Sequence, residues 1–170
     1  MSKYIDPVGI IQSPVGRRAI IVALSIAIAA PAEGLRTRAY RDPAQGVPTI
    51  CFGSTKGVKM GDTATPDQCR QLLTAEMLES VDQVDRCVPG LPPHVAAAFA
   101  DAAYNLGPTI VCDRNRSTAA RLLASGRLVE ACRELPKWSN ARVAGVLVSL
   151  PGLTKRRAAE MDLCLNGGAA

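Results

Sequence analysis

Two acidic side chains and one hydroxyl group lie within a short stretch near the N-terminal end of the sequence. Asp42 follows Glu33 by nine positions, and Thr49 follows Asp42 by seven. Splitting a bond between two sugars needs one carboxyl that protonates the leaving oxygen and another that acts on water or on developing positive charge. This segment could supply both groups. Spacing alone also fits a solvated helix end at Glu33 and a turn at Asp42.

An uncharged, apolar run from Ala19 to Ala32 ends directly before Glu33, and Arg17 and Arg18 precede it. A basic flank followed by an apolar run is typical of an export signal. As a helix the run would span about 21 Å, short of the roughly 30 Å hydrocarbon core, so we expect a weak hold on the membrane. Cleavage after Ala32 would leave Glu33 on a frayed end, and we therefore expect the segment to be retained. A buried core helix remains an alternative.

Length and charge narrow the possible classes of protein. A chain of 170 residues with net charge +5 fits one domain with two lobes and favours an anionic polymer as partner. The sequence has no basic block interleaved with aromatic residues, so we expect no binding to nucleic acid. We expect a monomer, with residues 1–32 as the N-terminal membrane segment and residues 33–170 as the functional domain.

The six cysteines favour an oxidising compartment. They form no C-x-x-C pair, which argues against a zinc site, and we expect neither a metal nor a cofactor. Six cysteines allow 15 connectivities, and the simplest hypothesis pairs neighbours in the sequence. This pairing hypothesis joins Cys51 with Cys69, Cys87 with Cys112, and Cys132 with Cys164. The alternative is that the cysteines are buried free thiols.

The pattern of apolar, Gly and Pro residues predicts an α+β fold, mostly helical with a small β-hairpin lobe. Residues 1–16 look like a loose lead, and residues 36–62 suggest hairpins. Thr65-Pro66-Asp67-Gln68 is a strong helix start. Helices are predicted over residues 65–86, 95–106, 117–124, 128–135 and 153–165.

The residues around the two acids match a known pattern. Glu33-Gly34-Leu35-Arg36, Ala39-Tyr40-x-Asp42 and Gly46-x-x-Thr49-Ile50-x-x-Gly53 closely resemble the start of the phage-type lysozymes of glycoside hydrolase family 24. The likeness continues through Tyr104-Asn105-x-Gly107 to Arg156-Arg157-x-x-Glu160, so it covers roughly residues 33–165. The apolar leader resembles that of the signal-arrest-release subgroup.

The resemblance implies a lysozyme-like fold and an endolysin that hydrolyses the β-1,4 bond between N-acetylmuramic acid and N-acetylglucosamine in peptidoglycan. Glu33 would be the general acid, Asp42 the ionised partner, and Thr49 the group that holds the attacking water. Asn105 could bind an N-acetyl group and Arg156 peptide-stem carboxylates, although a helix end and a surface charge are the alternatives. The subgroup implies export to the host periplasm, with residues 19–32 in the inner membrane until release.

Two departures from the family pattern stand out. Asp42 and Thr49 are one residue further apart than usual, and Ala44-Gln45 carries the extra residue. The leader has no cysteine, so activation by disulfide exchange through the leader is excluded and helix withdrawal is expected. Two other functions stay open: a basic, membrane-active protein without enzymatic activity, and a lytic transglycosylase, which leaves an anhydro end.

Overall fold

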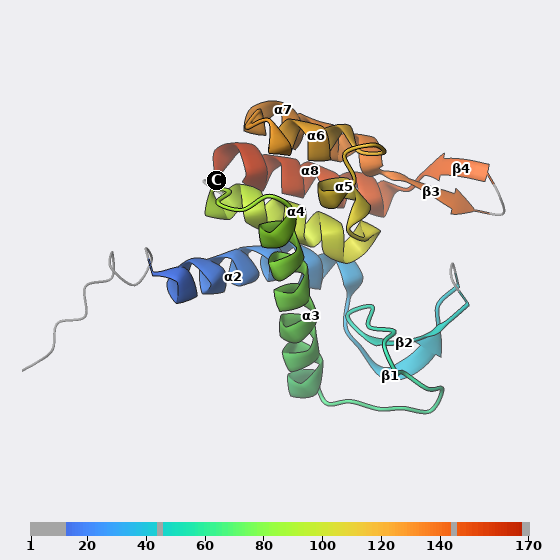
Figure 1. Ribbon diagram of the computed structural model, residues 1–170. Helices are drawn as coiled ribbons and strands as arrows, with labels where there is room; N and C mark the ends of the chain where they lie inside the picture. Colours follow the sequence, from blue (N-terminus) through green and yellow to red (C-terminus); the bar gives the residue numbers. More distant parts are fainter. Residues whose placement is uncertain (1–12, 44–45, 144–145, 168–170) are drawn as a thin grey trace, which may run out of the picture.

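The computed structural model describes residues 13–43, 46–143 and 146–167, and within them the predicted α+β fold is confirmed (Figure 1). Helices form the larger lobe, and a two-stranded sheet with its loops forms the smaller one. The extra residue expected at Ala44-Gln45 lies outside the described residues.

Helix α2, Pro14–Glu33, contains the apolar run. Ser13 caps it by accepting a hydrogen bond from the Gly16 amide at 3.0 Å, and Pro14 suits the first turn. The sequence predicted no helix before residue 17, but α2 already begins at Pro14. It ends at Gly34, whose positive φ of 70° suits glycine. Glu33 thus occupies the last helical position.

The small lobe is built on an antiparallel pair, β1 (Arg36–Arg41) and β2 (Pro48–Cys51). Tyr40 lies opposite Thr49, and the register shifts between Arg36 and Tyr40. The pairing agrees with the predicted hairpin region. It places the turn after Arg41 beside the start of β2, because Arg41 lies opposite Pro48.

Helix α3, Pro66–Cys87, connects the small lobe to the large one. The predicted capping box is present, because Thr65 accepts from the Gln68 amide at 3.2 Å and the Gln68 side chain accepts from the Thr65 amide at 2.8 Å. Helix α4, Pro93–Leu106, lies at the centre of the large lobe, and α2, α3 and α8 pack around it.

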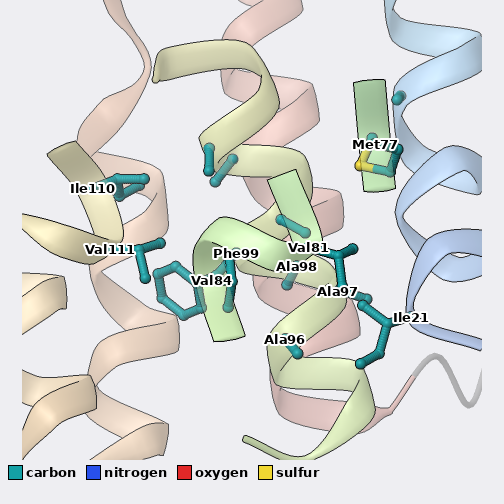
Figure 2. Packing of buried hydrophobic residues seen from close by; sticks show 14 of the residues in the cluster. Ile21, Met77, Val81, Val84, Ala96, Ala97, Ala98, Phe99, Ile110 and Val111 are labelled. Carbon is teal, nitrogen blue, oxygen red and sulfur yellow. The ribbon is translucent and has the colours of Figure 1, made fainter. Parts of the chain in front are cut away.

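The core centres on α4 because its alanines let neighbouring helices approach closely (Figure 2). Phe99 belongs to one buried cluster with Val84, Ile110 and Val111 (Figure 2). Ile21 of α2 belongs to the same cluster. The apolar run of the leader is therefore part of the core of the domain, with Ile21, Val22, Ser25 and Ala29 buried.

The C-terminal part of the chain is largely helical. Three of its helices were predicted to within a few residues, whereas the short α5, the 3-10 helix η1 and the β3–β4 hairpin were not. The elements are α5 (Thr109–Cys112), α6 (Thr118–Ala124), α7 (Leu128–Glu134), η1 (Leu135–Trp138), β3 (Asn140–Val143), β4 (Val146–Ser149) and α8 (Pro151–Asn166).

All six cysteines form disulfides, and the pairing of sequence neighbours is confirmed. Cys51–Cys69 joins β2 to α3 and so ties the small lobe to the large one. Cys87–Cys112 joins the end of α3 to α5, and Cys132–Cys164 joins α7 to α8. Such cross-links stabilise a fold mainly by restricting the unfolded chain.

Candidate active site

Glu33, Asp42 and Thr49 line one cleft of about 550 Å³ between the two lobes. Glu33 comes from the end of α2, Asp42 from the turn after β1, and Thr49 from β2. The side chain of Glu33 is 24% exposed. The structure therefore brings together the three residues that the spacing and the motif had predicted.

Helix α8 contributes Arg156, a buried residue that contacts Glu33. Arg156 donates from Nη1 to Oε1 of Glu33, and its side chain is only 3% exposed. The same guanidinium donates to both carboxylate oxygens of Asp101, at 2.9 and 2.8 Å. Burial by itself disfavours the charged guanidinium, but the hydrogen bonds and the negative charges of Asp101 and Glu33 raise the pKa of Arg156. Arg156 therefore stays charged and fixes Oε1 of Glu33.

Gly53 bounds the other oxygen of Glu33. A Cβ atom built on Gly53 would lie 3.2 Å from Oε2 of Glu33, and its φ of +90° already disfavours any other residue. Glycine at this position thus leaves room for the carboxyl group. Oε1 faces Arg156 and Oε2 lies beside Gly53 at the cleft.

The backbone of the small lobe positions Asp42 and Thr49. The Asp42 amide donates to the Val47 carbonyl at 2.9 Å, and the Gly46 amide donates to the Asp42 carbonyl at 2.7 Å, which closes the turn. Thr49 is 3% exposed, and its hydroxyl donates to the same Val47 carbonyl at 3.2 Å. With its proton committed, the Thr49 oxygen keeps its lone pairs as acceptors.

Asn105 lies at the end of α4 and lines the cleft. Nη2 of the buried Arg157 donates to Oδ1 of Asn105 at 3.2 Å and also contacts Glu160. The Asn105 amide is therefore oriented, with Oδ1 turned to Arg157 and the donor nitrogen left for other partners.

Arg156 and Arg157 are buried, so the surface-charge interpretation of this pair is wrong. Arg156 has Glu33 and Asp101 as partners beneath the cleft, and it is not among the cleft-lining residues. Its position corrects the expected contact with peptide-stem carboxylates, because the guanidinium is already occupied. The geometry gives Arg156 the role of holding Glu33.

Sequence reasoning missed three polar residues of this site: Glu76, Asp101 and the hydroxyl of Tyr104. Asp101 lies fully buried within the alanine-rich α4, and a buried charge requires a partner. This rule could have predicted that Asp101 pairs with an arginine. Glu76 and Tyr104 line the same cleft as Glu33. No motif pointed to Glu76.

Comparison with known proteins identifies the family. The model of the family described as phage lysozyme matches residues 30–160. The chain belongs to the phage lysozyme family. It is a lysozyme, a glycoside hydrolase of the muramidase type, and its apolar N-terminal helix is consistent with a signal-arrest-release (SAR) segment. The hypothesis of a protein without enzymatic activity is thereby overturned.

One curated relative and two solved structures show how similar the chain is to individual members of the family in sequence and in fold. The SAR-endolysin of Pseudomonas phage phiKMV is 40% identical over 150 residues, covering 87% of this chain and 90% of the relative. The active form of P1 phage endolysin Lyz superposes with a TM-score of 0.73 at 26% identity, covering 91% of this chain and 95% of that one. The secreted inactive form of Lyz reaches a TM-score of 0.55 at 22% identity, covering 85% and 94%.

Proposed function

We propose that this phage lysozyme hydrolyses the β-1,4 bond between N-acetylmuramic acid and N-acetylglucosamine of bacterial peptidoglycan, with Glu33 as the general acid. The observation that carries the proposal is the convergence of Glu33, Asp42 and Thr49 on one cleft from three separate elements. An acid and an ionised carboxyl flanking a sugar-binding cleft are the groups that glycoside hydrolysis needs.

The two oxygens of Glu33 have different surroundings and therefore different tasks. Oε1 accepts from Arg156, whereas Oε2 lies beside Gly53 at the cleft. Oε2 is the atom that carries the proton to the leaving glycosidic oxygen. A positioned proton transfer of this kind typically contributes about 10²–10⁴-fold to the rate.

Asp42 and Thr49 act on the water that attacks the sugar. Because the Thr49 hydroxyl donates to Val47, its oxygen accepts a hydrogen from this water. Asp42 accepts the second hydrogen and stabilises the oxocarbenium-like centre. A held water that attacks from the face opposite the leaving group gives inversion at the anomeric carbon.

Asn105 binds the substrate. Its Oδ1 is held by Arg157, so its amide nitrogen is the group available to donate to a carbonyl oxygen such as that of an N-acetyl group. The amide lies in the same cleft as Glu33. Orientation by a buried guanidinium lowers the cost of ordering this side chain on binding.

The leader controls activity by its location. We assign residues 1–32 to a SAR segment and residues 33–170 to the catalytic domain, with the apolar run of residues 19–32 in the inner membrane before release. Among the described residues, α2 is the one helix long and apolar enough to cross a membrane by length and composition. With that run in a bilayer, Glu33 would lie at the membrane surface, away from Arg156. The host periplasm is the compartment in which the released enzyme works.

The structure of α2 suits both environments. Ser25 donates to the Ile21 carbonyl of its own helix at 2.8 Å, which satisfies the hydroxyl in a bilayer, and also to the Ala97 carbonyl at 3.0 Å in the packed domain. Arg17 and Arg18 form ion pairs with Asp85 and Asp82 of α3. The greater likeness to the active form of Lyz than to its inactive form supports the packed helix as the released arrangement.

Glu33→Gln tests the function. The variant keeps the size of the side chain but lacks the transferable proton. A suspension of purified peptidoglycan, whose turbidity the wild type lowers, should therefore stay almost fully turbid with the variant. Mass spectrometry of the wild-type products identifies the reaction, because hydrolysis adds water and a lytic transglycosylase leaves an anhydro end. A variant as active as the wild type, or anhydro products, would contradict the proposal.

A further inference from the structure

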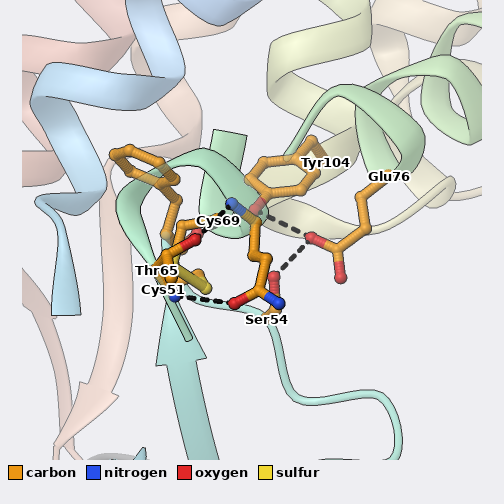
Figure 3. Close-up of a disulfide and its surroundings, with 8 residues drawn as sticks. Cys51, Ser54, Thr65, Cys69, Glu76 and Tyr104 are labelled. Carbon is orange, nitrogen blue, oxygen red and sulfur yellow. Dashed lines mark hydrogen bonds between the residues drawn. A yellow bond between two sulfur atoms is a disulfide. The ribbon is translucent and has the colours of Figure 1, made fainter. Parts of the chain in front are cut away.

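Two side chains of the helical lobe, Tyr104 and Glu76, form hydrogen bonds with the Phe52–Ser54 loop, which lies next to Glu33. The Tyr104 hydroxyl of α4 donates to the Phe52 carbonyl at 2.8 Å, and the Ser54 hydroxyl donates to Oε2 of Glu76 on α3 at 2.8 Å (Figure 3). Phe52 and Ser54 flank Gly53, the residue that bounds Oε2 of Glu33. The contacts therefore hold both sides of the residue that lies against the general acid.

Glu76 and Tyr104 also bind each other. The Tyr104 hydroxyl lies 3.3 Å from the same Oε2 of Glu76 that accepts from Ser54 (Figure 3). Burial and the negative charge of Glu76 raise the pKa of Tyr104, so its phenol keeps its proton and remains a donor. The one phenolic hydrogen is thus shared between the Phe52 carbonyl and Oε2 of Glu76, and the same Oε2 accepts from Ser54 of the small lobe.

The loop itself has little conformational freedom. Ile50 and Ser54 exchange two backbone hydrogen bonds of 2.9 Å, and the disulfide from Cys51 to Cys69 fixes one end. Cys51 has a φ of 61°, a left-handed conformation that costs a non-glycine residue about 1–2 kcal/mol. Such a conformation persists only where surrounding contacts impose it.

We propose that Glu76 and Tyr104 form a positioning clamp, which presses the Phe52–Ser54 loop against Glu33 and so sets the direction of its Oε2. The clamp rests on the proposed role of Glu33. Arg156 fixes one oxygen of the carboxyl, and the clamped loop limits where the other can lie. Neither clamp residue transfers a proton, and both act through the loop. Their loss is therefore expected to change the turnover number more than the binding of substrate.

Tyr104→Phe and Ser54→Ala test the clamp by kinetics on a soluble peptidoglycan oligosaccharide of defined length. Each variant removes one bond to the loop, and we expect kcat to fall about 10- to 100-fold with KM close to that of the wild type, as for small misplacements of catalytic groups. Because both side chains act through one loop, the fold-decrease in kcat of the double variant should be smaller than the product of the two single fold-decreases.

Ser117→Ala is the matched control. Ser117 is buried, donates to the Ile110 carbonyl at 2.8 Å and caps α6, and it does not line the cleft. The control should lower the melting temperature while kcat stays at the wild-type value. Glu33→Gln in the same assay establishes the general acid independently. A kcat of Tyr104→Phe within about twofold of the wild type, or a loss expressed only in KM, would overturn the clamp alone.

Discussion

Arg156 of α8 contacts Glu33 of α2 across 123 positions of the sequence, and Asp101 of α4 holds the same guanidinium from the other side. Three helices thus meet beneath one carboxyl group. The arrangement requires the apolar leader to be packed in the domain, because Glu33 is the last residue of that leader helix. The position of the Glu33 carboxyl group therefore depends on the position of the leader helix.

Replacing Arg156 by methionine should destabilise the fold strongly. The change leaves the fully buried carboxylate of Asp101 without its partner, and breaking a buried pair in this way costs about 3–5 kcal/mol. Arg127→Met is the control, because Arg127 pairs with Glu130 at the solvent-exposed surface, where an ion pair contributes little to stability. Urea denaturation of both variants measures the difference. Equal losses would show that Arg156 does not hold Asp101 as described.

Gly53→Ala should reduce activity more than its effect on stability explains. The new methyl group would lie 3.2 Å from Oε2 of Glu33 and push the carboxyl aside, in addition to the strain at φ +90°. Gly61→Ala is a close match, since Gly61 has a φ of +99° but nothing within 4 Å of the added Cβ. Both variants should lose roughly 1 kcal/mol or more of stability, as alanine does at positive φ. Only Gly53→Ala should lose kcat, and a similar kcat for both would refute the contact.

The sequence predicted best where one local rule decides the structure. The capping box at Thr65 and Gln68 marks its helix unambiguously, and proline and glycine bound the other long helices. The disulfide pairs were found by the simplest pairing. Glu33, Asp42 and Thr49 were identified from a motif, and the folded chain brings all three to one cleft.

What the sequence did not reveal depends on contacts between distant elements. The partner of Arg156 could not be chosen from spacing, since Asp101 and Glu33 lie on two other helices. Glu76 has no motif around it and gains its role only when α3 meets the Phe52–Ser54 loop. The β3–β4 hairpin was missed because its strands are four residues each and give too short a pattern.

Removing the acidic partners of the leader should reduce the fraction of enzyme that is released from the membrane. Asp82 and Asp85 form ion pairs with Arg18 and Arg17 only when α2 is packed on the domain. The double variant Asp82→Asn/Asp85→Asn therefore weakens the released state while the apolar run is unchanged. We expect the membrane potential to hold the leader in the bilayer. After the membrane potential of sealed vesicles is collapsed, we therefore expect a smaller fraction of released, active enzyme for the double variant than for the wild type.

Glu130→Gln serves as the control for this experiment, because Glu130 pairs with Arg127 on α7 and its ion pair does not involve α2. The control should be released like the wild type. Exposed ion pairs contribute little each, so the effect on unfolding of the released form should be about 1 kcal/mol or less. Wild-type release of the double variant would show that these ion pairs do not drive the leader out of the bilayer.

Glu160 should make the fold less stable as the pH rises. Burial, and the proximity of Asp101, raise the pKa of Glu160 from 4.5 to about 10 in the folded chain, against the opposing charges of Arg157 and Arg156. The folded chain then holds a proton that the unfolded chain releases above about pH 4.5. The stability contributed by this proton is complete below that pH and is lost progressively as the pH rises towards 10.

Glu160→Gln keeps a neutral side chain of the same size, so its free energy of unfolding should fall less than that of the wild type between about pH 6 and about pH 9. Asp162→Asn on the same helix is the control, because Asp162 is exposed and should retain the wild-type pH dependence. Denaturant titrations at the two pH values measure both slopes. Parallel curves for the wild type and Glu160→Gln would mean that Glu160 is ionised throughout, with Arg157 charged beside it in a buried ion pair.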